Sequence, residues 1–244
     1  TPHAPRVLAG GGPALEAEQH GDRFTLHGAG FDLTFDAHAG TLASWRLGAR
    51  ELLIEGPRLD IWRAPTDNDN TSWGDEQAAR QWRAAGLDRV EHRVTAVTGE
   101  RLGPALVRVC IESQVGAPEA SCGLRVLYNY DVYGSGELLL STETVPYGDL
   151  PDLPRLGLQL TLPAAFDQMT WFGRGPYETY PDRKTGARVG VYRGSVKAQH
   201  TPYIKPQENG NKTDVRWVAL TDASGAGLLA AGMPLLNVSA HHYT

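Results

Sequence analysis

The stretch that decides the fold is Leu124-Arg125-Val126-Leu127-Tyr128-Asn129-Tyr130-Asp131-Val132, which Gly134-Ser135-Gly136 joins to Glu137-Leu138-Leu139-Leu140. Leu124, Val126, Tyr128, Tyr130 and Val132 occupy every second position, which is the period of a strand with one buried face. A short Gly-rich link between two such runs is typical of a tight hairpin. We therefore predict an antiparallel hairpin formed by residues 122–133 and 137–146.

The same strand pattern continues on both sides of this hairpin. Before it, we expect strands around 24–26, 31–35, 42–47, 88–97 and 104–113, and after it around 155–162, 168–173, 187–193, 214–221, 226–232 and 235–240. One helix is expected at 75–85, where Ala78, Ala79, Trp82 and Ala85 share a face and Gly86 provides a stop. The fold class is thus all-β: one large antiparallel sandwich over residues 21–244, preceded by a tail or linker at 1–20.

Composition excludes several classes of function. A net charge of −5 provides no basic surface for nucleic acid or an anionic membrane. No run reaches the roughly 20 apolar residues that span a bilayer. Cys110 and Cys122, the only cysteines, favour a reduced, cytoplasmic protein. The alternative is a disulfide, if a hairpin turning near Gly116 places the two thiols opposite one another.

Three segments combine Gly and Pro with acids, amides and Arg, and are interpreted as rigid loops that present polar groups. They are Arg63-Ala64-Pro65-Thr66-Asp67-Asn68-Asp69, Phe172-Gly173-Arg174-Gly175-Pro176-Tyr177-Glu178-Thr179-Tyr180-Pro181-Asp182-Arg183 and Tyr203-Ile204-Lys205-Pro206-Gln207-Glu208-Asn209-Gly210. Such a surface could face carbohydrate. It could equally consist of long turns whose acids only satisfy local backbone donors.

In this order, the three segments resemble the C-terminal sandwich domain of lacZ-type β-galactosidases, glycoside hydrolase family 2. The resemblance implies a supersandwich related to galactose mutarotases, belonging to a longer parent enzyme that hydrolyses terminal β-D-galactosyl residues, as in lactose breakdown. It also implies that the catalytic glutamates lie in a separate barrel, so no catalytic residue is expected in this chain. Cofactors are expected to be none here, with Mg and Na bound elsewhere in a parent that is cytoplasmic, bacterial and a homo-oligomer.

The resemblance also implies that the chain stops before a family Trp that lines the aglycone part of the active site. We expect the last strands of the sandwich to be missing as well, which would leave an unpaired edge that promotes self-association. The partners implied are the catalytic barrel, the other parent domains and the galactoside substrate.

The residues expected to touch sugar or a neighbouring domain are Asp182, Arg183, Glu208, Asn209, Glu178, Tyr177, Tyr180 and Tyr203. Arg63, Asp67, Asn68 and Asp69 are expected to form a structural loop, with Arg63 bound to the acids and the turn capping the helix near residue 75. A calcium loop starting at Asp67 would require Gly and Glu where Ser72 and Ala78 stand, so that hypothesis fails. His241 and His242 lack companions at metal-ligand spacing, and no metal site is expected.

Four other functions remain open at this stage. The chain could be a stand-alone carbohydrate-binding module, or a pure interface domain without sugar contact. It could be an aldose mutarotase that uses His200 and Glu208 as acid and base. It could also hydrolyse glycosides itself with a pair chosen from Glu178, Asp182 and Glu208, provided that two carboxyl groups lie about 5 to 10 Å apart across a sugar.

Overall fold

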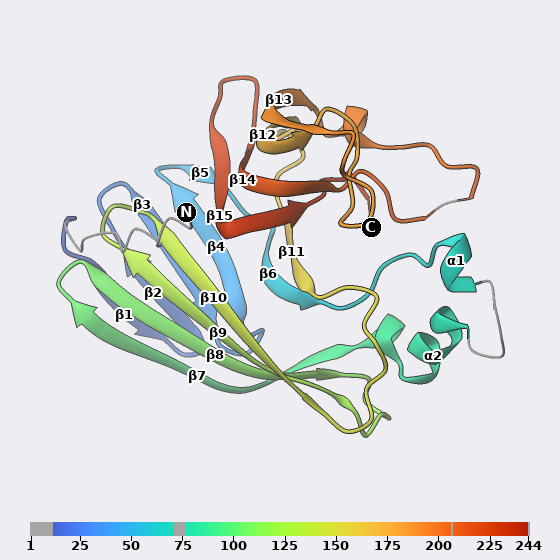
Figure 1. Ribbon diagram of the computed structural model, residues 1–244. Coiled ribbons are helices and arrows are strands. Elements are labelled where there is room, and N and C mark those ends of the chain that lie inside the picture. Colours follow the sequence, from blue (N-terminus) through green and yellow to red (C-terminus); the bar gives the residue numbers. More distant parts are fainter. Residues whose placement is uncertain (1–11, 71–76, 206, 244) are drawn as a thin grey trace. The chain divides into compact units, whose positions relative to one another are not determined.

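A computed structural model describes residues 12–70, 77–205 and 207–243 (Figure 1). It confirms the all-β prediction, because antiparallel strands dominate and the helices are short. The described residues fall into two compact units, and the boundary between them in the sequence lies between Thr161 and Leu162. We call residues 12–161 the N-terminal unit and residues 162–243 the C-terminal unit, and describe each by itself.

The first sheet of the N-terminal unit contains five strands that follow one another in sequence order. They are β1 (Glu16–His20), β2 (Arg23–His27), β3 (Phe31–Asp36), β4 (Thr41–Leu47) and β5 (Arg50–Glu51). β1 begins within the range that the sequence assigned to a tail. Leu26, Leu33 and Phe35 are fully buried, because they occupy the inward positions of β2 and β3.

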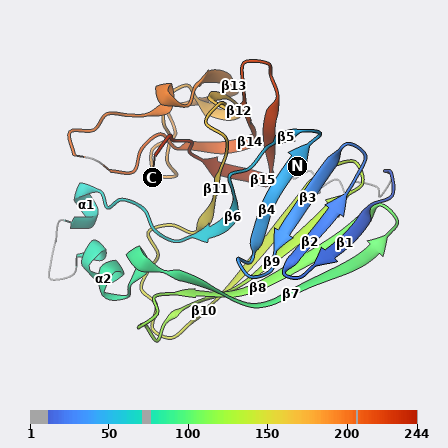
Figure 2. The ribbon, with the colours of Figure 1, turned by 180° about the vertical axis from the view of Figure 1, so that it is seen from behind.

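The second sheet of this unit has the order β10-β9-β8-β7. Its strands are β7 (Glu91–Gly103), β8 (Leu106–Gly116), β9 (Gly123–Tyr133) and β10 (Leu138–Tyr147). β9 and β10 form the predicted hairpin, with Leu140 opposite Tyr130. The rings of Tyr130 and Phe35 lie 5.1 Å apart, so the two sheets share one core, and they face each other in Figure 2. This unit is therefore a sandwich.

Helices and a short two-stranded sheet complete the N-terminal unit. β6 (Glu55–Asp60) pairs with β11 (Gly157–Thr161), and the amide of Leu59 donates to the Tyr128 hydroxyl at 2.9 Å. The predicted helix is α2 (Ala78–Ala84), which the 3-10 turn η1 (Leu87–Arg89) follows. Its expected start at residue 75 lies outside the described residues. The acidic segment forms a one-turn helix, α1 (Asp67–Asn70).

The C-terminal unit contains one sheet of the order β13-β12-β14-β15. Its strands are β12 (Gln168–Gly175), β13 (Arg188–Ser195), β14 (Lys212–Thr221) and β15 (Gly227–Val238), with the 3-10 turn η2 (Lys197–Gln199) after β13. Two separate strands were expected at 226–232 and 235–240, but a single strand with shifted register covers most of both. Met169, Trp171, Val196, Val215 and Val218 form its buried core.

The alternative of a Cys110–Cys122 disulfide is wrong. Both thiols are free, because the register of β8 and β9 places Asn129 opposite Cys110, while Cys122 lies just before β9 begins. The thiol of Cys110 is 3.0 Å from the side-chain oxygen of Asn129. Within the described part of the chain, no helix is long and apolar enough to cross a membrane.

Candidate functional site

The segments 172–183 and 203–210 both belong to the C-terminal unit. Residues 172–175 form the end of β12, contrary to the expected loop, so we call residues 176–183 the first loop and residues 203–210 the second loop, of which Pro206 lies outside the described residues. β12 and β14 are the two inner strands of the sheet. The first loop follows β12, and the second loop leads through Asn211 into β14. Because β12 and β14 are neighbours in the sheet, the two loops emerge side by side. The sequence proposed both segments as polar loops, and the fold brings them together.

Glu178 joins the two loops. One of its carboxylate oxygens accepts hydrogen bonds from Arg183 at 2.5 Å and from the hydroxyl of Tyr203, and the other accepts from the amide of Gly210 at 2.8 Å. Arg183 also donates to the Tyr203 hydroxyl at 2.8 Å. Both oxygens of Glu178 are therefore engaged by groups from the two loops.

These contacts favour the ionised form of the Glu178 carboxyl group. Burial alone would raise its pKa, but hydrogen bonds from Tyr203, Gly210, Arg183 and Thr201 outweigh burial and hold the pKa below the usual glutamate value. Its side chain is only 8% exposed. A general acid needs a proton near neutral pH, so Glu178 is suited to holding the loops together and not to proton donation.

Thr179 makes a second connection between the first loop and the start of β14. Its amide donates to the carbonyl of Asn211 at 2.7 Å, and the side-chain nitrogen of Asn211 donates to the carbonyl of Thr179, also at 2.7 Å. The Thr179 hydroxyl accepts from the amide of Thr213 at 2.9 Å. Both threonines are buried, so this contact fixes the base of the loops.

Asn209 is buried and shapes the second loop. Its side-chain oxygen accepts from the amide of Thr201, and its side-chain nitrogen donates to the carbonyl of Gln207, each at 3.1 Å. Its own carbonyl lies 3.1 Å from Nε2 of His241. The predicted contact residue Asn209 thus uses its polar groups within the C-terminal unit.

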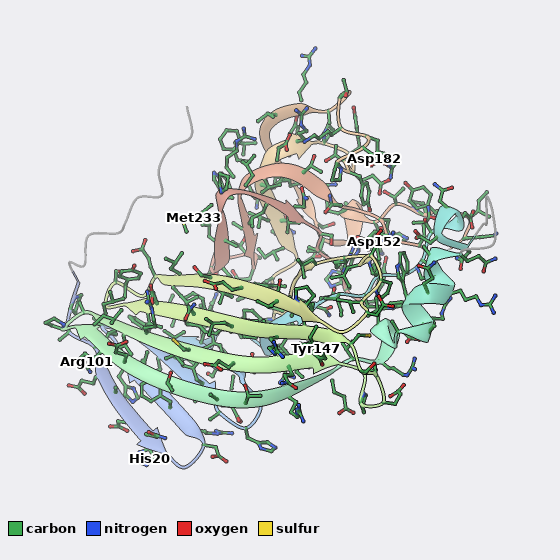
Figure 3. All side chains as sticks on the ribbon, turned by 60° about the horizontal axis from the view of Figure 1, so that its bottom comes forward. His20, Arg101, Tyr147, Asp152, Asp182 and Met233 are labelled. Atoms are coloured by element: carbon green, nitrogen blue, oxygen red, sulfur yellow. The ribbon has the colours of Figure 1, made fainter. Side chains whose placement is uncertain are left out.

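The remaining predicted contact residues differ in exposure. Asp182 and Arg183 lie on the surface of the unit, as Figure 3 shows for Asp182, and Tyr177 is 55% exposed while donating to the carbonyl of Gly186 at 2.7 Å. Tyr180 and Glu208 are half-buried. Burial raises the pKa of Tyr180, and the charges of Glu208 and Glu178 raise it further. The outward-facing candidates are therefore Tyr177, Asp182 and Arg183.

Lys212 is a site residue that sequence reasoning missed. Its side chain is 1% exposed, and its ammonium lies 5.2 Å from the centre of the Trp171 ring. Burial lowers its pKa to about 8, although the charge of Glu178 opposes the shift. No local pattern could have identified it, because a lysine at the start of a strand is ordinarily exposed.

The segment 63–69 belongs to the N-terminal unit and is organised around Asp69. Arg63 forms two hydrogen bonds with this carboxylate, at 2.6 and 3.1 Å, and the amide and hydroxyl of Thr66 donate to it at 2.6 and 2.8 Å. Burial would raise the pKa of Asp69, but these partners lower it. The predicted link between Arg63 and the acids is confirmed for Asp69, whereas Asp67 and Asn68 are exposed. The guanidinium of Arg63 also lies over the ring of Trp82.

Within the described residues, His, Cys, Asp and Glu side chains do not gather into a group of three that could hold a metal ion. His242 instead pairs with Asp167 at 2.8 Å, and His200 contacts the hydroxyl of Tyr243. These contacts join the residues that follow β15 to His200, between η2 and the second loop, and to Asp167, just before β12. The prediction that Mg and Na bind elsewhere in a parent enzyme stays a prediction.

Comparison with known proteins shows which family the sequence of this chain resembles. A family model described as "Beta galactosidase small chain" matches residues 27–244. A β-galactosidase of Priestia megaterium is 38% identical over 232 residues, which is 95% of this chain and 22% of the relative. β-Galactosidases of Vibrio cholerae and Psychromonas ingrahamii are 36% and 31% identical, over 84% and 91% of the chain. The chain spans about a fifth of the length of these relatives.

Proposed function

Because the chain belongs to the β-galactosidase small-chain family, we propose that it is a non-catalytic domain of a longer enzyme that hydrolyses terminal β-D-galactosyl residues. The observation that carries this proposal is the extent of the similarity. Nearly the whole chain aligns with a β-galactosidase, but it accounts for only 22% of that relative. The remaining four-fifths of such an enzyme then contains the catalytic carboxylates.

The hydrogen bonds that occupy both carboxylate oxygens of Glu178 support a structural role for the two loops. A glycosidase needs one carboxylic acid that can give a proton and a second carboxylate that faces the sugar. Glu178 has a lowered pKa and both oxygens occupied, so it fits neither part. The loops instead form a rigid polar platform, whose outward side chains Tyr177, Asp182 and Arg183 contact the catalytic barrel or the rim of its sugar pocket.

Further properties of the parent enzyme belong to the same proposal. It is a cytoplasmic, bacterial homo-oligomer whose Mg and Na ions lie outside this chain. The C-terminal unit would shape the substrate pocket of that enzyme without reacting with the sugar. An aromatic face such as that of Tyr177 suits contact with a sugar ring or with an apolar neighbour.

The test uses the full-length enzyme with Tyr177→Ala and Asp182→Ala, assayed for hydrolysis of an aryl β-galactoside. Side chains that shape the pocket without reacting affect substrate binding, so we expect a rise in KM of about 3- to 10-fold with kcat nearly unchanged. Glu143→Ala, on the exposed face of β10, is the control. Unchanged KM in both variants together with altered assembly would replace this role with that of a pure interface.

A further inference from the structure

Asn209 and Gly210 form the only Asn-Gly pair in the sequence. Such a pair is chemically labile in a flexible chain, because glycine has no side chain to keep its backbone nitrogen away from the amide of the preceding asparagine. The nitrogen of Gly210 can attack Cγ of Asn209, which forms a succinimide ring and expels Nδ2 as ammonia together with the proton from Gly210. Water then opens the ring at one of its two carbonyl groups, which leaves aspartate or isoaspartate at position 209.

The fold requires both residues at this place. Gly210 has a φ angle of +76°, and a Cβ there would lie 2.8 Å from the carbonyl oxygen of Gln199, so a larger residue would be strained. Asn209 is 8% exposed, and its side-chain oxygen and nitrogen bind Thr201 and Gln207. An ionised aspartate could not donate to the carbonyl of Gln207. The labile pair is therefore part of the structure of the second loop.

The folded chain opposes the reaction at the atoms that take part in it. The amide of Gly210 donates to Glu178 at 2.8 Å, so the attacking nitrogen is engaged. Negative charge develops on this nitrogen as its proton leaves, and the neighbouring carboxylate raises the free energy of that charge. The lowered pKa of Glu178 also makes its carboxylate a weak base for removing the proton. The two hydrogen bonds of the Asn209 side chain restrict its rotation toward the attacking nitrogen.

The hydrogen bond between Gly210 and Glu178 thus has a chemical consequence. We propose that this contact suppresses succinimide formation, and that Asn209 is a site of deamidation that becomes reactive once the contact with Glu178 is lost. The modification then prevents the loop from forming again. A carboxylate at position 209 would face the carbonyl oxygen of Gln207 without a proton to donate, and isoaspartate adds an atom to the backbone of the loop.

The experiment follows Asn209 by peptide mass spectrometry while the full-length protein that contains this chain is incubated at mildly alkaline pH, and an isoaspartyl methyltransferase detects isoaspartate. The synthetic peptide of residues 203–213 gives the reaction rate without the fold. Glu178→Ala removes both the acceptor and the charge. Asp182→Ala, at an exposed position of the first loop, is the matched control. Val215→Ala is a second control, which lowers stability by removing a core contact instead of a loop contact.

We expect Asn209 of the unsubstituted protein to react at least about 100-fold more slowly than the peptide, and Glu178→Ala to raise its rate at least about 10-fold, because local opening exposes the pair. Both controls should change the rate less than about 3-fold. A rate in the unsubstituted protein equal to that of the peptide, or no increase in Glu178→Ala, would overturn the inference. So would an equal increase in Val215→Ala, since it would assign the protection to the global stability of the fold.

Urea denaturation establishes that each variant is folded before the rates are compared. If Glu178→Ala does not fold, Glu178→Gln, which removes only the charge, decides the question. An increase of at least about 3-fold in Glu178→Gln supports the inference, and an unchanged rate contradicts it. The readout is the chemical state of Asn209 and does not depend on hydrolysis of a galactoside, so the proposed activity can fail without affecting this result.

Discussion

At the scale of single residues, Glu178 is the side chain on which both loops depend. Of its four donors, Arg183 belongs to the first loop, Tyr203 and Gly210 lie at the two ends of the second loop, and Thr201 lies just before it. The sequence identified Glu178, Arg183 and Tyr203 as candidate contact residues. It could not show that Glu178 binds Tyr203 and Gly210, because these two partners are distant in sequence and the pairing of β12 with β14 brings them close.

Glu178→Gln should destabilise the chain by about 1 to 3 kcal/mol at pH 7, because a buried carboxylate with charged and neutral donors is replaced by a neutral amide. The folded pKa is depressed, so the contribution is present above the unfolded value of 4.5 and is lost as the pH falls through the folded pKa. Urea denaturation of both proteins from pH 7 to pH 3 measures this difference.

Asp182→Asn, at an exposed position of the same loop, is the control and should change the free energy of unfolding by less than about 0.5 kcal/mol. A Glu178→Gln variant as stable as Asp182→Asn at pH 7 would show that Glu178 does not hold the loops together.

Lys212 makes the stability of the chain rise with pH as Glu178 does, but in a more alkaline window and because its charged form is disfavoured in the folded chain. Its pKa is about 8 in the folded chain against 10.5 when unfolded, so the unfolded state binds more protons between these values. The free energy of unfolding should therefore rise with pH over this window, and Lys212→Met should be more stable than the unsubstituted chain at pH 7 by up to about 3 kcal/mol.

The comparison is made by urea denaturation at pH 7, 9 and 10.5, with Lys197→Met as the exposed-lysine control. The advantage of Lys212→Met should shrink steadily as the pH rises. An advantage that is independent of pH would mean that Lys212 is not held in a destabilised, charged form at pH 7.

At the scale of elements, sequence patterns predicted the long strands well. β9 and β10 were recognised because alternating side chains and a Gly-rich link occur together, and the register agrees. β6 was missed because Glu55-Gly56-Pro57-Arg58-Leu59-Asp60 lacks the alternation that identifies a half-buried strand. α1 was expected to be a turn, since Asp and Asn favour turns over helices. In the structure it is a one-turn helix whose Asp69 carboxylate accepts hydrogen bonds from Thr66 and Arg63.

The connection from α2 to η1 depends on Gly86. Its φ angle is +73°, and a Cβ there would approach the Cβ of Ala117 to 2.4 Å. Gly48 also has a positive φ, +58°, but an added Cβ would meet nothing within 4 Å. Gly48→Ala should therefore lower the free energy of unfolding by about 1 kcal/mol, through backbone strain alone. Gly86→Ala should lower it by about 1 to 3 kcal/mol beyond that value, because the added Cβ also clashes with Ala117. Equal melting temperatures for the two variants would contradict this account.

At the scale of the whole molecule, β13 and β15 are the outer strands of the sheet in the described C-terminal unit. Exposed apolar side chains on both make the isolated chain prone to associate with itself. Sedimentation velocity should show oligomers of the chain that grow with concentration. Leu229→Glu should reduce this association because it places a charge among the exposed apolar side chains of β15, whereas Ala223→Glu, in the exposed turn before β15, should not. A monodisperse monomer at all concentrations would count against the prediction.

The function of the molecule could be predicted only through its family resemblance. Composition leads us to expect neither nucleic acid nor a membrane as partner, but nothing in the periodicity of the strands indicates a galactoside. The loop motifs made the resemblance specific, and the similarity of residues 27–244 to the small-chain family confirmed it. The exposure of Val191 and Leu229 could not be predicted from sequence, because both are core-type residues whose exposure depends on the layers that surround them.

The most direct test of the central claim is hydrolysis of an aryl β-galactoside by the purified chain, alone and after mixing with the separately produced remainder of a full-length enzyme. We predict no activity from either part and recovery of activity in the mixture. Activity in the chain alone would contradict the account, and would require a catalytic pair among Glu178, Asp182 and Glu208.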